Sequence, residues 1–151
     1  MAKLTSYSMK FEGELLQRGF WLYVWKIRTG DACHLYVGRT GDSSSANAAS
    51  PFQRIGQHLD SRTHAKGNSL ARQLKDLTVD PSVCSFEMIA VGPLFSEQET
   101  FESHKPIRDQ VGALEVALAR RLSDRVYNVI GTHSSSQSPE PKLFRQVCRK
   151  I

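Results

Sequence analysis

Hydrophobic residues occur along this chain in short blocks, separated by polar, glycine-rich and serine-rich segments. Residues 20–27 (FWLYVWKI) are nearly all apolar, many of them aromatic or β-branched, and the run is too short for a typical helix. This block predicts a central strand that is buried on both faces. Residues 34–38 (HLYVG) predict a second strand, and 28–32 (RTGDA) predicts the turn that joins the two in an antiparallel hairpin.

A helix start follows the small-residue loop at 41–50. Ser50 is a suitable N-cap, Pro51 suits the first helical position, and Gln53 completes a capping box. The helix is expected to carry an apolar stripe and, on an adjacent face, a polar row with a spacing of four residues. The polar row consists of Arg54, His58 and Arg62.

Further elements are predicted downstream. They are a helix at 68–77, a strand at 84–91 closed by Gly92 and Pro93, a short acidic helix opened by Ser96 and Glu99, and a longer helix at 107–123. Val111, Leu114, Leu118 and Leu122 form the apolar stripe of the longer helix. A short helix at 12–18, the segment 127–130 and a basic terminal helix complete the pattern.

This order of elements predicts an α+β fold, in which a small three-stranded antiparallel sheet is flanked by helices. A chain of 151 residues with 40% hydrophobic residues suits one domain. We expect the domain at 1–131, with its core at about 19–130, and a Ser/Pro-rich linker with a short basic helix at 132–151. The apolar runs are far too short for a membrane span, and the start lacks the apolar core of a secretory signal. Three widely spaced cysteines provide no disulfide framework, so a cytoplasmic protein without a membrane partner is expected.

Charge is unevenly distributed along the chain. The formal net charge is +5, and between residues 53 and 75 five Lys or Arg residues are accompanied by Asp60 alone. The next thirty residues are predominantly acidic, and the last ten are basic again. Segregated charge of this kind suits a polyanion on one face, although an ordinary solvated surface explains it about as well. The candidate nucleic-acid-binding residues are Arg62, Lys66, Arg72 and Lys75.

A dispersed set of polar residues resembles the motifs of the GIY-YIG nuclease superfamily. Its members in this chain are Tyr23, the Tyr36-Val37-Gly38 triplet, Arg54, His58, Glu115 and Asn128. Each motif is weak alone, but their order and their expected secondary structures match the family from about residue 19 to residue 130. Two departures occur: the first motif reads Trp21-Leu22-Tyr23, and the 41–50 loop lengthens the gap before Arg54. The loop affects how a substrate would approach that edge.

The resemblance implies a phosphodiester hydrolase with a single metal ion. Glu115 would be the Mg²⁺ ligand, with Mn²⁺ as a possible substitute, because Mg²⁺ is held by one or two carboxylates plus waters and phosphate. The planar guanidinium of Arg54 would bind the phosphate. Family mechanisms favour Tyr36 as the general base, with Arg39 lowering its pKa, whereas His58 could relay the proton or act as the base itself.

The same resemblance assigns two supporting residues. Tyr23 would help to orient the water, and Asn128 would have a structural or phosphate-positioning role. Each site residue also has an ordinary explanation: the tyrosines as strand packing, Arg54 and His58 as a solvated helix face, and Asn128 as a turn residue. Glu115 fits that explanation least well, because it interrupts the apolar side of a Leu/Ala-rich helix.

Three functions are therefore weighed. The first is a Mg²⁺-dependent endonuclease acting on duplex or branched DNA. The second is a nucleic-acid-binding module on the same fold that cleaves weakly or not at all, and the third is an interaction module whose charge is incidental. The complete set of polar residues favours the enzyme. A protein partner or a homo-oligomer remains open.

Overall fold

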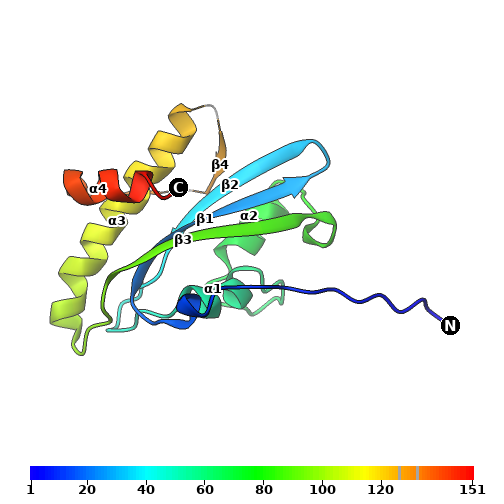
Figure 1. Cartoon of the computed structure of the whole chain (residues 1–151), viewed down its shortest axis with the longest axis horizontal. Coiled ribbons are helices and arrows are strands. Elements are labelled where there is room, and N and C mark those ends of the chain that lie inside the picture. The colour runs from blue at the N-terminus through cyan, green and yellow to red at the C-terminus, as the bar shows by residue number, and fades with distance from the viewer. Residues whose placement is uncertain (126, 132) are drawn as a thin grey trace.

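The chain forms an α+β fold around a four-stranded mixed sheet (Figure 1). The computed structural model describes residues 1–125, 127–131 and 133–151. The strands are β1 (Phe20–Thr29), β2 (Ala32–Arg39), β3 (Ser85–Phe95) and β4 (Asn128–Ile130). They lie in the order β3-β1-β2-β4, with β1 antiparallel to both β2 and β3 and β4 parallel to β2.

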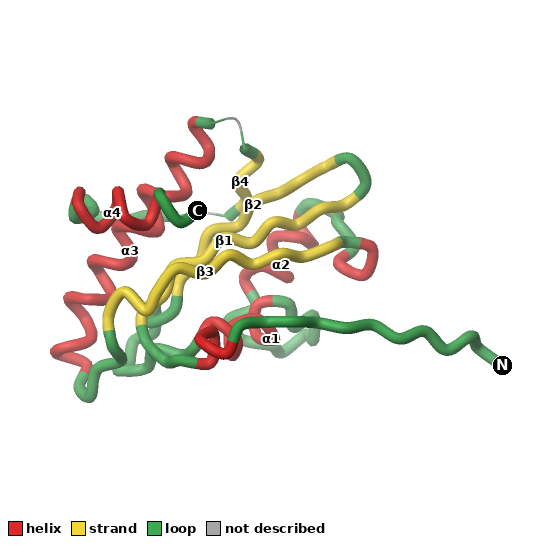
Figure 2. The backbone as a smooth tube through the Cα atoms, viewed as in Figure 1, coloured by secondary structure: helices red, strands yellow, loops and turns green. Residues whose placement is uncertain are grey.

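Helices cover both faces of the sheet (Figure 2). The α-helices are α1 (Pro51–His58), α2 (Ser69–Asp76), α3 (Phe101–Asp124) and α4 (Pro141–Cys148), and two 3₁₀ turns span Gly13–Leu16 (η1) and Pro81–Val83 (η2). α3 and α4 lie on one side of the sheet, whereas α1 and α2 lie on the other (Figure 1). None of the described helices is long and apolar enough to span a membrane.

The alternating side chains of β1 supply both hydrophobic cores. Leu22 and Val24 point into the core that α3 and α4 cover. Tyr23, Trp25 and Ile27 point the other way, into the core beneath α1 and α2. All five side chains are buried, which confirms the prediction of a central strand covered on both faces. Because both faces of β1 are occupied, residues on neighbouring positions of this strand serve opposite sides of the molecule.

The predicted start of α1 is confirmed in detail. The Ser50 hydroxyl accepts a hydrogen bond from the Gln53 backbone N–H at 3.2 Å, and the Gln53 side chain accepts one from the Ser50 backbone N–H at 3.2 Å. The end of the helix differs from the expectation. α1 stops at His58, so Arg62 lies in the following loop and not on the same helical face as Arg54.

Three expected elements are corrected by the structure. The sheet has four strands, because the segment after α3 adds β4 in parallel to the edge of β2. β3 continues past Gly92 and Pro93 to Phe95, which an edge strand tolerates because a proline there need not donate to a second neighbour. The two helices expected between 96 and 123 are one helix, α3, capped by Thr100 and continuous through Pro106.

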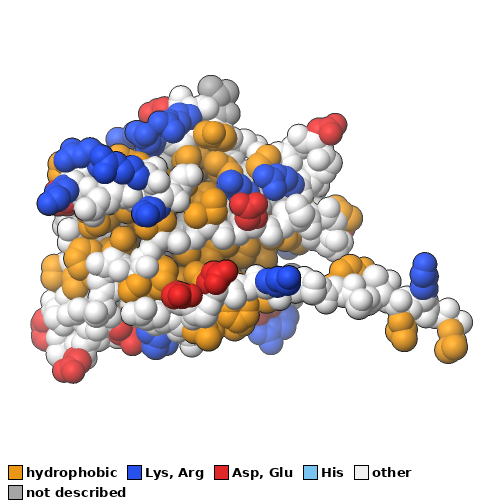
Figure 3. Space-filling model, in the orientation of Figure 1, with side chains coloured by type: hydrophobic (Ala, Val, Ile, Leu, Met, Phe, Trp, Pro, Cys, Tyr) orange, Lys and Arg blue, Asp and Glu red, His pale blue; other side chains and the backbone are white. Residues whose placement is uncertain are grey.

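The two ends of the chain differ in how they contact the rest of the domain. Residues before η1 extend away from the domain and expose Leu4, Tyr7 and Met9 (Figure 3). α4, in contrast, buries Val147 against the core on the α3 side, and Lys and Arg side chains gather on its outer surface (Figure 3). Thr132, the first residue of the expected Ser/Pro-rich linker, lies outside the described residues.

Gly38 is required by the close approach of the Tyr23 ring across the β1–β2 pair. The two residues are register partners, and a Cβ on Gly38 would lie 2.8 Å from both Cζ and the hydroxyl oxygen of Tyr23. Gly56, on α1, has no other atom within 4 Å of the equivalent position.

We expect Gly38→Ala to lower the free energy of unfolding by about 1–3 kcal/mol, the usual cost of overpacking a core. Gly56→Ala should raise it by up to about 1 kcal/mol, because alanine is the better helix former. Urea unfolding curves of the two variants and the wild type measure both effects. A Gly38→Ala protein as stable as the wild type would contradict the close packing of Tyr23.

Candidate functional site

The shortness of β4 leaves an opening at the end of the sheet. β4 pairs with β2 only along His34–Tyr36, so the last residues of β2 continue past it without a neighbouring strand in the described sheet. A cavity of about 310 Å³ lies at this place, between α2 on one face of the sheet and α3 on the other. Its lining residues are Tyr36, Ser69, Arg72, Gln73, Asp76, Glu115, Gly131 and His133.

Tyr23 and His58 form a buried hydrogen-bonded pair behind this cavity. The Tyr23 hydroxyl contacts His58 Nε2 and donates to the Arg39 backbone oxygen at 3.1 Å. A hydroxyl has one proton, so the pair is satisfied when His58 Nε2–H donates to Tyr23. His58 Nδ1 then carries a lone pair, and it is buried with no hydrogen-bond partner among the described residues.

Burial keeps Tyr23 and His58 uncharged. It raises the pKa of the Tyr23 hydroxyl far above its usual value, and the Arg54 charge opposes this shift. Burial also lowers the pKa of His58 to about 4, and the nearby Arg54 charge acts in the same direction. His58 is therefore neutral at pH 7.

Arg54 extends from α1 toward the same polar cluster. Its side chain is 13% exposed, and its Nη1 donates to Gln57 Oε1 at 2.5 Å while Nη2 lies 3.5 Å from Asp42 Oδ2. Arg54 Nε is buried and has no partner among the described residues. The cationic group is thus held close to Tyr23 and His58, and its side chain is largely buried.

Tyr36 connects this cluster to the cavity. It lies on the same face of the sheet as Tyr23, and its ring packs edge-on against His58 with centroids 5.6 Å apart. Burial raises the pKa of its hydroxyl, and the negative charge of Glu115 raises it further. Both tyrosines therefore keep their protons at neutral pH in this structure.

Glu115 reaches the cavity from α3 and is held there by two cationic or donor groups. Arg39 Nε donates to Glu115 Oε2 at 2.5 Å, and His133 Nε2 lies 3.5 Å from Glu115 Oε1. The carboxylate is 17% exposed. Burial raises the pKa of Glu115, while Arg39 and then His133 oppose the shift.

The position of Arg39 differs from the one that its expected role requires. We expected it to lower the pKa of Tyr36, but its guanidinium turns to α3, where it binds Glu115 and donates to the Arg108 backbone oxygen at 2.7 Å. Gly112 permits this approach, because a Cβ there would lie 3.2 Å from the guanidinium carbon. Arg39 therefore balances the charge of the carboxylate, and the pKa of Tyr36 is raised instead of lowered.

Asn128 is not brought to the cavity. It begins β4 opposite His34, and its amide nitrogen lies 2.6 Å from His34 Nδ1 on an exposed part of the sheet. The structure thus brings Tyr23, Tyr36, Arg39, Arg54, His58 and Glu115 together, and leaves Asn128 at the far end of its short strand.

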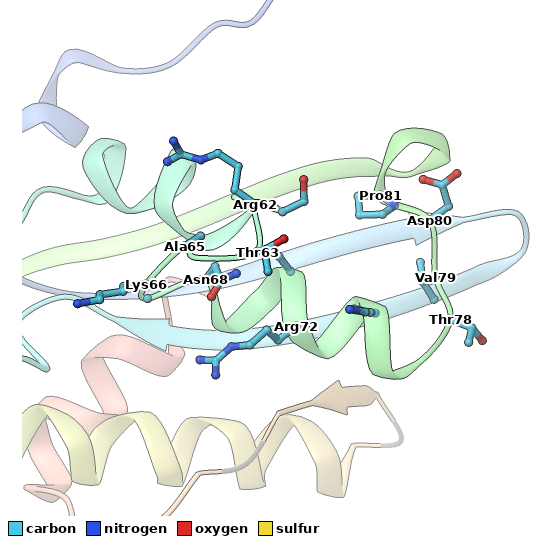
Figure 4. Close-up of a pocket in the computed structure, with 14 residues that line it drawn as sticks. Arg62, Thr63, Ala65, Lys66, Asn68, Arg72, Thr78, Val79, Asp80 and Pro81 are labelled. Atoms are coloured by element: carbon cyan, nitrogen blue, oxygen red, sulfur yellow. The ribbon is translucent and has the colours of Figure 1, made fainter.

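All four candidate nucleic-acid-binding residues line one hollow beside the cavity. This hollow, which we call the α2 groove, has a volume of about 920 Å³ and includes Arg62, Lys66, Arg72 and Lys75 in its wall. In Figure 4 the side chains of Arg62, Lys66 and Arg72 extend to the same side, whereas Asp80 lies at the opposite end. Arg72 borders both the α2 groove and the cavity, so the two are contiguous.

The cavity offers oxygen donors suited to a magnesium ion. Glu115 Oε1 is not hydrogen-bonded at normal distance, and the Asp76 carboxylate lines the same cavity. Hard oxygen ligands of this kind, completed by waters and phosphate, are what Mg²⁺ prefers. Among the described residues, no three His, Cys, Asp or Glu side chains lie close enough together to form a complete metal cage. The donor set therefore fits an ion held partly by solvent and substrate.

Sequence reasoning overlooked three polar residues near the candidate site. His133 falls in the segment expected to be a Ser/Pro-rich linker, and Asp42 falls in the small-residue loop at 41–50. Asp76 lies at the end of α2, where sequence spacing does not connect it to Glu115. Gly131 has a φ of 94°, a conformation that glycine favours. A glycine two residues before His133 was therefore the signal in the sequence that the chain turns there.

Comparison with known proteins supplies no relatives. No protein-family model matches the chain, and no curated protein and no solved structure matches it significantly.

The lowered pKa of His58 predicts a specific loss of stability in acid. Between about pH 6.5 and pH 4 the unfolded chain binds a proton at His58 that the folded protein does not, so the free energy of unfolding falls as the pH falls. The full effect is about 3 kcal/mol, from about 1.4 kcal/mol per pH unit. Urea unfolding of the wild type and His58→Gln across this range should show a steeper pH dependence for the wild type.

His64→Gln provides the matched control, since His64 is exposed in the loop after α1. It should keep the wild-type slope. The raised pKa of Glu115 changes the free energy of unfolding with pH in the opposite direction. Because Glu115 is present in all three proteins, its contribution cancels when their slopes are compared. Equal slopes for the wild type and His58→Gln would contradict the burial of a neutral His58.

Proposed function

We propose that this protein is a metal-dependent DNA endonuclease that hydrolyses phosphodiester bonds at the cavity between α2 and α3. The observation that carries the proposal is the convergence of Tyr23, Tyr36, Arg54, His58 and Glu115, which are spread over 93 residues of sequence, around one small polar region. Packing alone does not require two tyrosines, a neutral histidine, a buried arginine and a buried carboxylate to meet. The resemblance to GIY-YIG nucleases adds support, because it draws on the same residues.

A phosphodiester hydrolase must activate water and balance the negative charge that develops on the phosphoryl oxygens. Glu115 would hold a Mg²⁺ ion, which when bound acidifies water and polarises the phosphate; Mn²⁺ could replace it. Asp76, on the opposite wall, would orient water at the same ion. Arg54, whose side chain is largely buried and keeps its charge, would stabilise the transition state.

The general base would be Tyr36 or His58, and the structure separates their positions. Tyr36 borders the cavity but keeps its proton, because burial and Glu115 both raise its pKa. His58 is neutral with a free Nδ1 lone pair, but it lies behind the tyrosines and is 2% exposed. His58 is thus the unprotonated group of the two, but its lowered pKa makes it a weak base. Tyr36 would contact the water, and Tyr23 would fix the imidazole.

The α2 groove would hold the DNA backbone next to the cavity. Its four Lys and Arg side chains suit phosphates, and Arg72 would guide the strand from the groove to the cavity. Duplex and branched DNA both fit this chemistry, and a DNA substrate agrees with the cytoplasmic location that the sequence predicts. The groove by itself also supports the second candidate, a nucleic-acid-binding module without efficient cleavage.

Replacement of Glu115 distinguishes these two functions. We expect Glu115→Gln to reduce cleavage of plasmid DNA in Mg²⁺ by at least about 100-fold, because the carboxylate ligand of the metal is lost. DNA affinity should be retained, because the α2 groove is intact. Glutamine keeps an oxygen for Arg39, whereas alanine would leave a buried cation unpaired at a cost of about 3–5 kcal/mol. The measurement is cleavage of plasmid and branched DNA, with Mg²⁺ and with EDTA.

Glu102→Gln is the matched control, because it makes the same change at an exposed position of α3. It should cleave like the wild type. A wild type that binds DNA but does not cleave it in Mg²⁺ or Mn²⁺ would support the binding module instead. Unchanged cleavage by folded Glu115→Gln would remove Glu115 from the mechanism.

The α2 groove makes a separate prediction about salt. Each phosphate contact on duplex DNA contributes about 0.9 to the slope of log affinity against log salt concentration. Simultaneous replacement of Arg62, Lys66 and Lys75 by alanine should therefore weaken binding and flatten the slope by about two to three units. Arg72 is left in place because it also borders the cavity.

The corresponding control removes the same charge from the other face of the sheet. Lys142, Arg145 and Lys150 lie on or next to α4 and are exposed. Their triple alanine variant should retain the wild-type slope if the groove alone binds the phosphates. Equal slopes for the groove variant and the wild type would show that the groove is only a solvated surface.

A further inference from the structure

His133 lies in the cavity wall and is not needed to explain the fold. Its side chain is 10% exposed, and it follows Gly131, whose φ of 94° turns the chain after β4. The turn brings the imidazole across the open end of β2, where no strand pairs with Val37 in the described sheet. His133 thus occupies the same opening that creates the cavity.

One nitrogen of His133 contacts two different elements. Nε2 lies 2.8 Å from the Val37 backbone oxygen, and because a carbonyl oxygen only accepts, Nε2 must carry a proton there. The same nitrogen lies 3.5 Å from Glu115 Oε1, a contact that is longer than a normal hydrogen bond. His133 therefore connects the strand that bears Tyr36 with the carboxylate that comes from α3.

Arg39 makes the equivalent connection on the other side of the carboxylate. It also belongs to β2, two residues beyond Val37, and it binds Glu115 Oε2 at 2.5 Å. Each oxygen of Glu115 therefore lies beside a residue that is tied to β2: Arg39 is hydrogen-bonded to Oε2, and His133 lies 3.5 Å from Oε1. Without His133, Oε1 would have no neighbouring donor among the contacts described for Glu115.

We infer that His133 is a positioning residue, which holds Glu115 Oε1 at a fixed distance from Tyr36 so that a divalent cation can bind between them. This role rests on the proposed function. Groups that orient a metal ligand affect metal affinity or turnover by about 10- to 100-fold when they are removed. They do not contact DNA, so the KM for DNA should not change.

The experiment compares His133→Ala, His133→Gln and Ser134→Ala in the full chain. Ser134 is the exposed neighbour of His133 and is the matched control. The measurements are kcat and KM for cleavage of plasmid DNA in Mg²⁺, and Mn²⁺ binding to the DNA-free protein by titration calorimetry. Circular dichroism establishes that each variant is folded.

We expect His133→Ala to lower kcat and weaken Mn²⁺ binding by about 10- to 100-fold with the KM for DNA unchanged. His133→Gln should recover most of both losses, because its side-chain amide can still donate to Val37. Ser134→Ala should match the wild type. A residue with a merely structural role would lower thermal stability without a selective loss of Mn²⁺ affinity.

Three negative results are distinguishable. If the wild type cleaves DNA and binds Mn²⁺ but His133→Ala behaves like Ser134→Ala, the positioning role is overturned and the proposed function stands. If His133→Gln is folded but no better than His133→Ala, the donor role is also overturned. A wild type that neither cleaves DNA nor binds Mn²⁺ overturns the proposed function, and the positioning role with it.

Discussion

The buried carboxylate of Glu115 is the group on which the arrangement of the cavity depends. A carboxylate that has lost most of its water requires a nearby cation, and Arg39 supplies one from the end of β2. This ion pair joins the sheet to α3 at the point where β4 no longer covers β2. The same negative charge raises the pKa of Tyr36 across the cavity. The direction of Arg39 and the raised pKa of Tyr36 are thus both connected to one buried charge.

The two-sided sheet explains why the cavity can exist at all. β1 is covered on both faces, so α3 and α2 lie on opposite sides and would not meet around a wider sheet. β4 is only three residues long, and beyond it residues of α2 and α3 border the same cavity. Residues from α2, β2, α3 and the turn after β4 can then line one cavity. A longer β4 would pair with Val37 and occupy the position of His133.

The basic side chains are also divided between the two sides of the sheet. The cations of the α2 groove lie next to the cavity, and Arg72 contributes to both. The cations of α4 lie on the opposite face, over the other core (Figure 3). A polyanion in the α2 groove would therefore reach the cavity directly, whereas one on α4 would be separated from it by the sheet. This difference makes the two basic segments unequal despite their similar composition.

The sequence by itself determined the features that depend on neighbouring residues. The apolar run of β1, the hairpin turn at Gly30 and the capping box at Ser50 are local patterns, and the structure confirms each of them. Tyr23, Arg54, His58 and Glu115 could likewise be selected from the sequence as candidate site residues, because their residue types and order carry a chemical pattern. Whether they form an active site remains a proposal.

Tertiary structure alone decided how these residues meet. β4 has three residues and pairs in parallel with a distant strand, so no local pattern predicts it. Arg39 binds the buried carboxylate of Glu115 and not the hydroxyl of Tyr36. This choice depends on how α3 packs against the sheet and not on sequence spacing. Asn128 was separated from the cavity, and His133 was brought into it, by the register of β4 against β2. Long-range packing sets burial and register, and these two quantities determine which polar groups face one another.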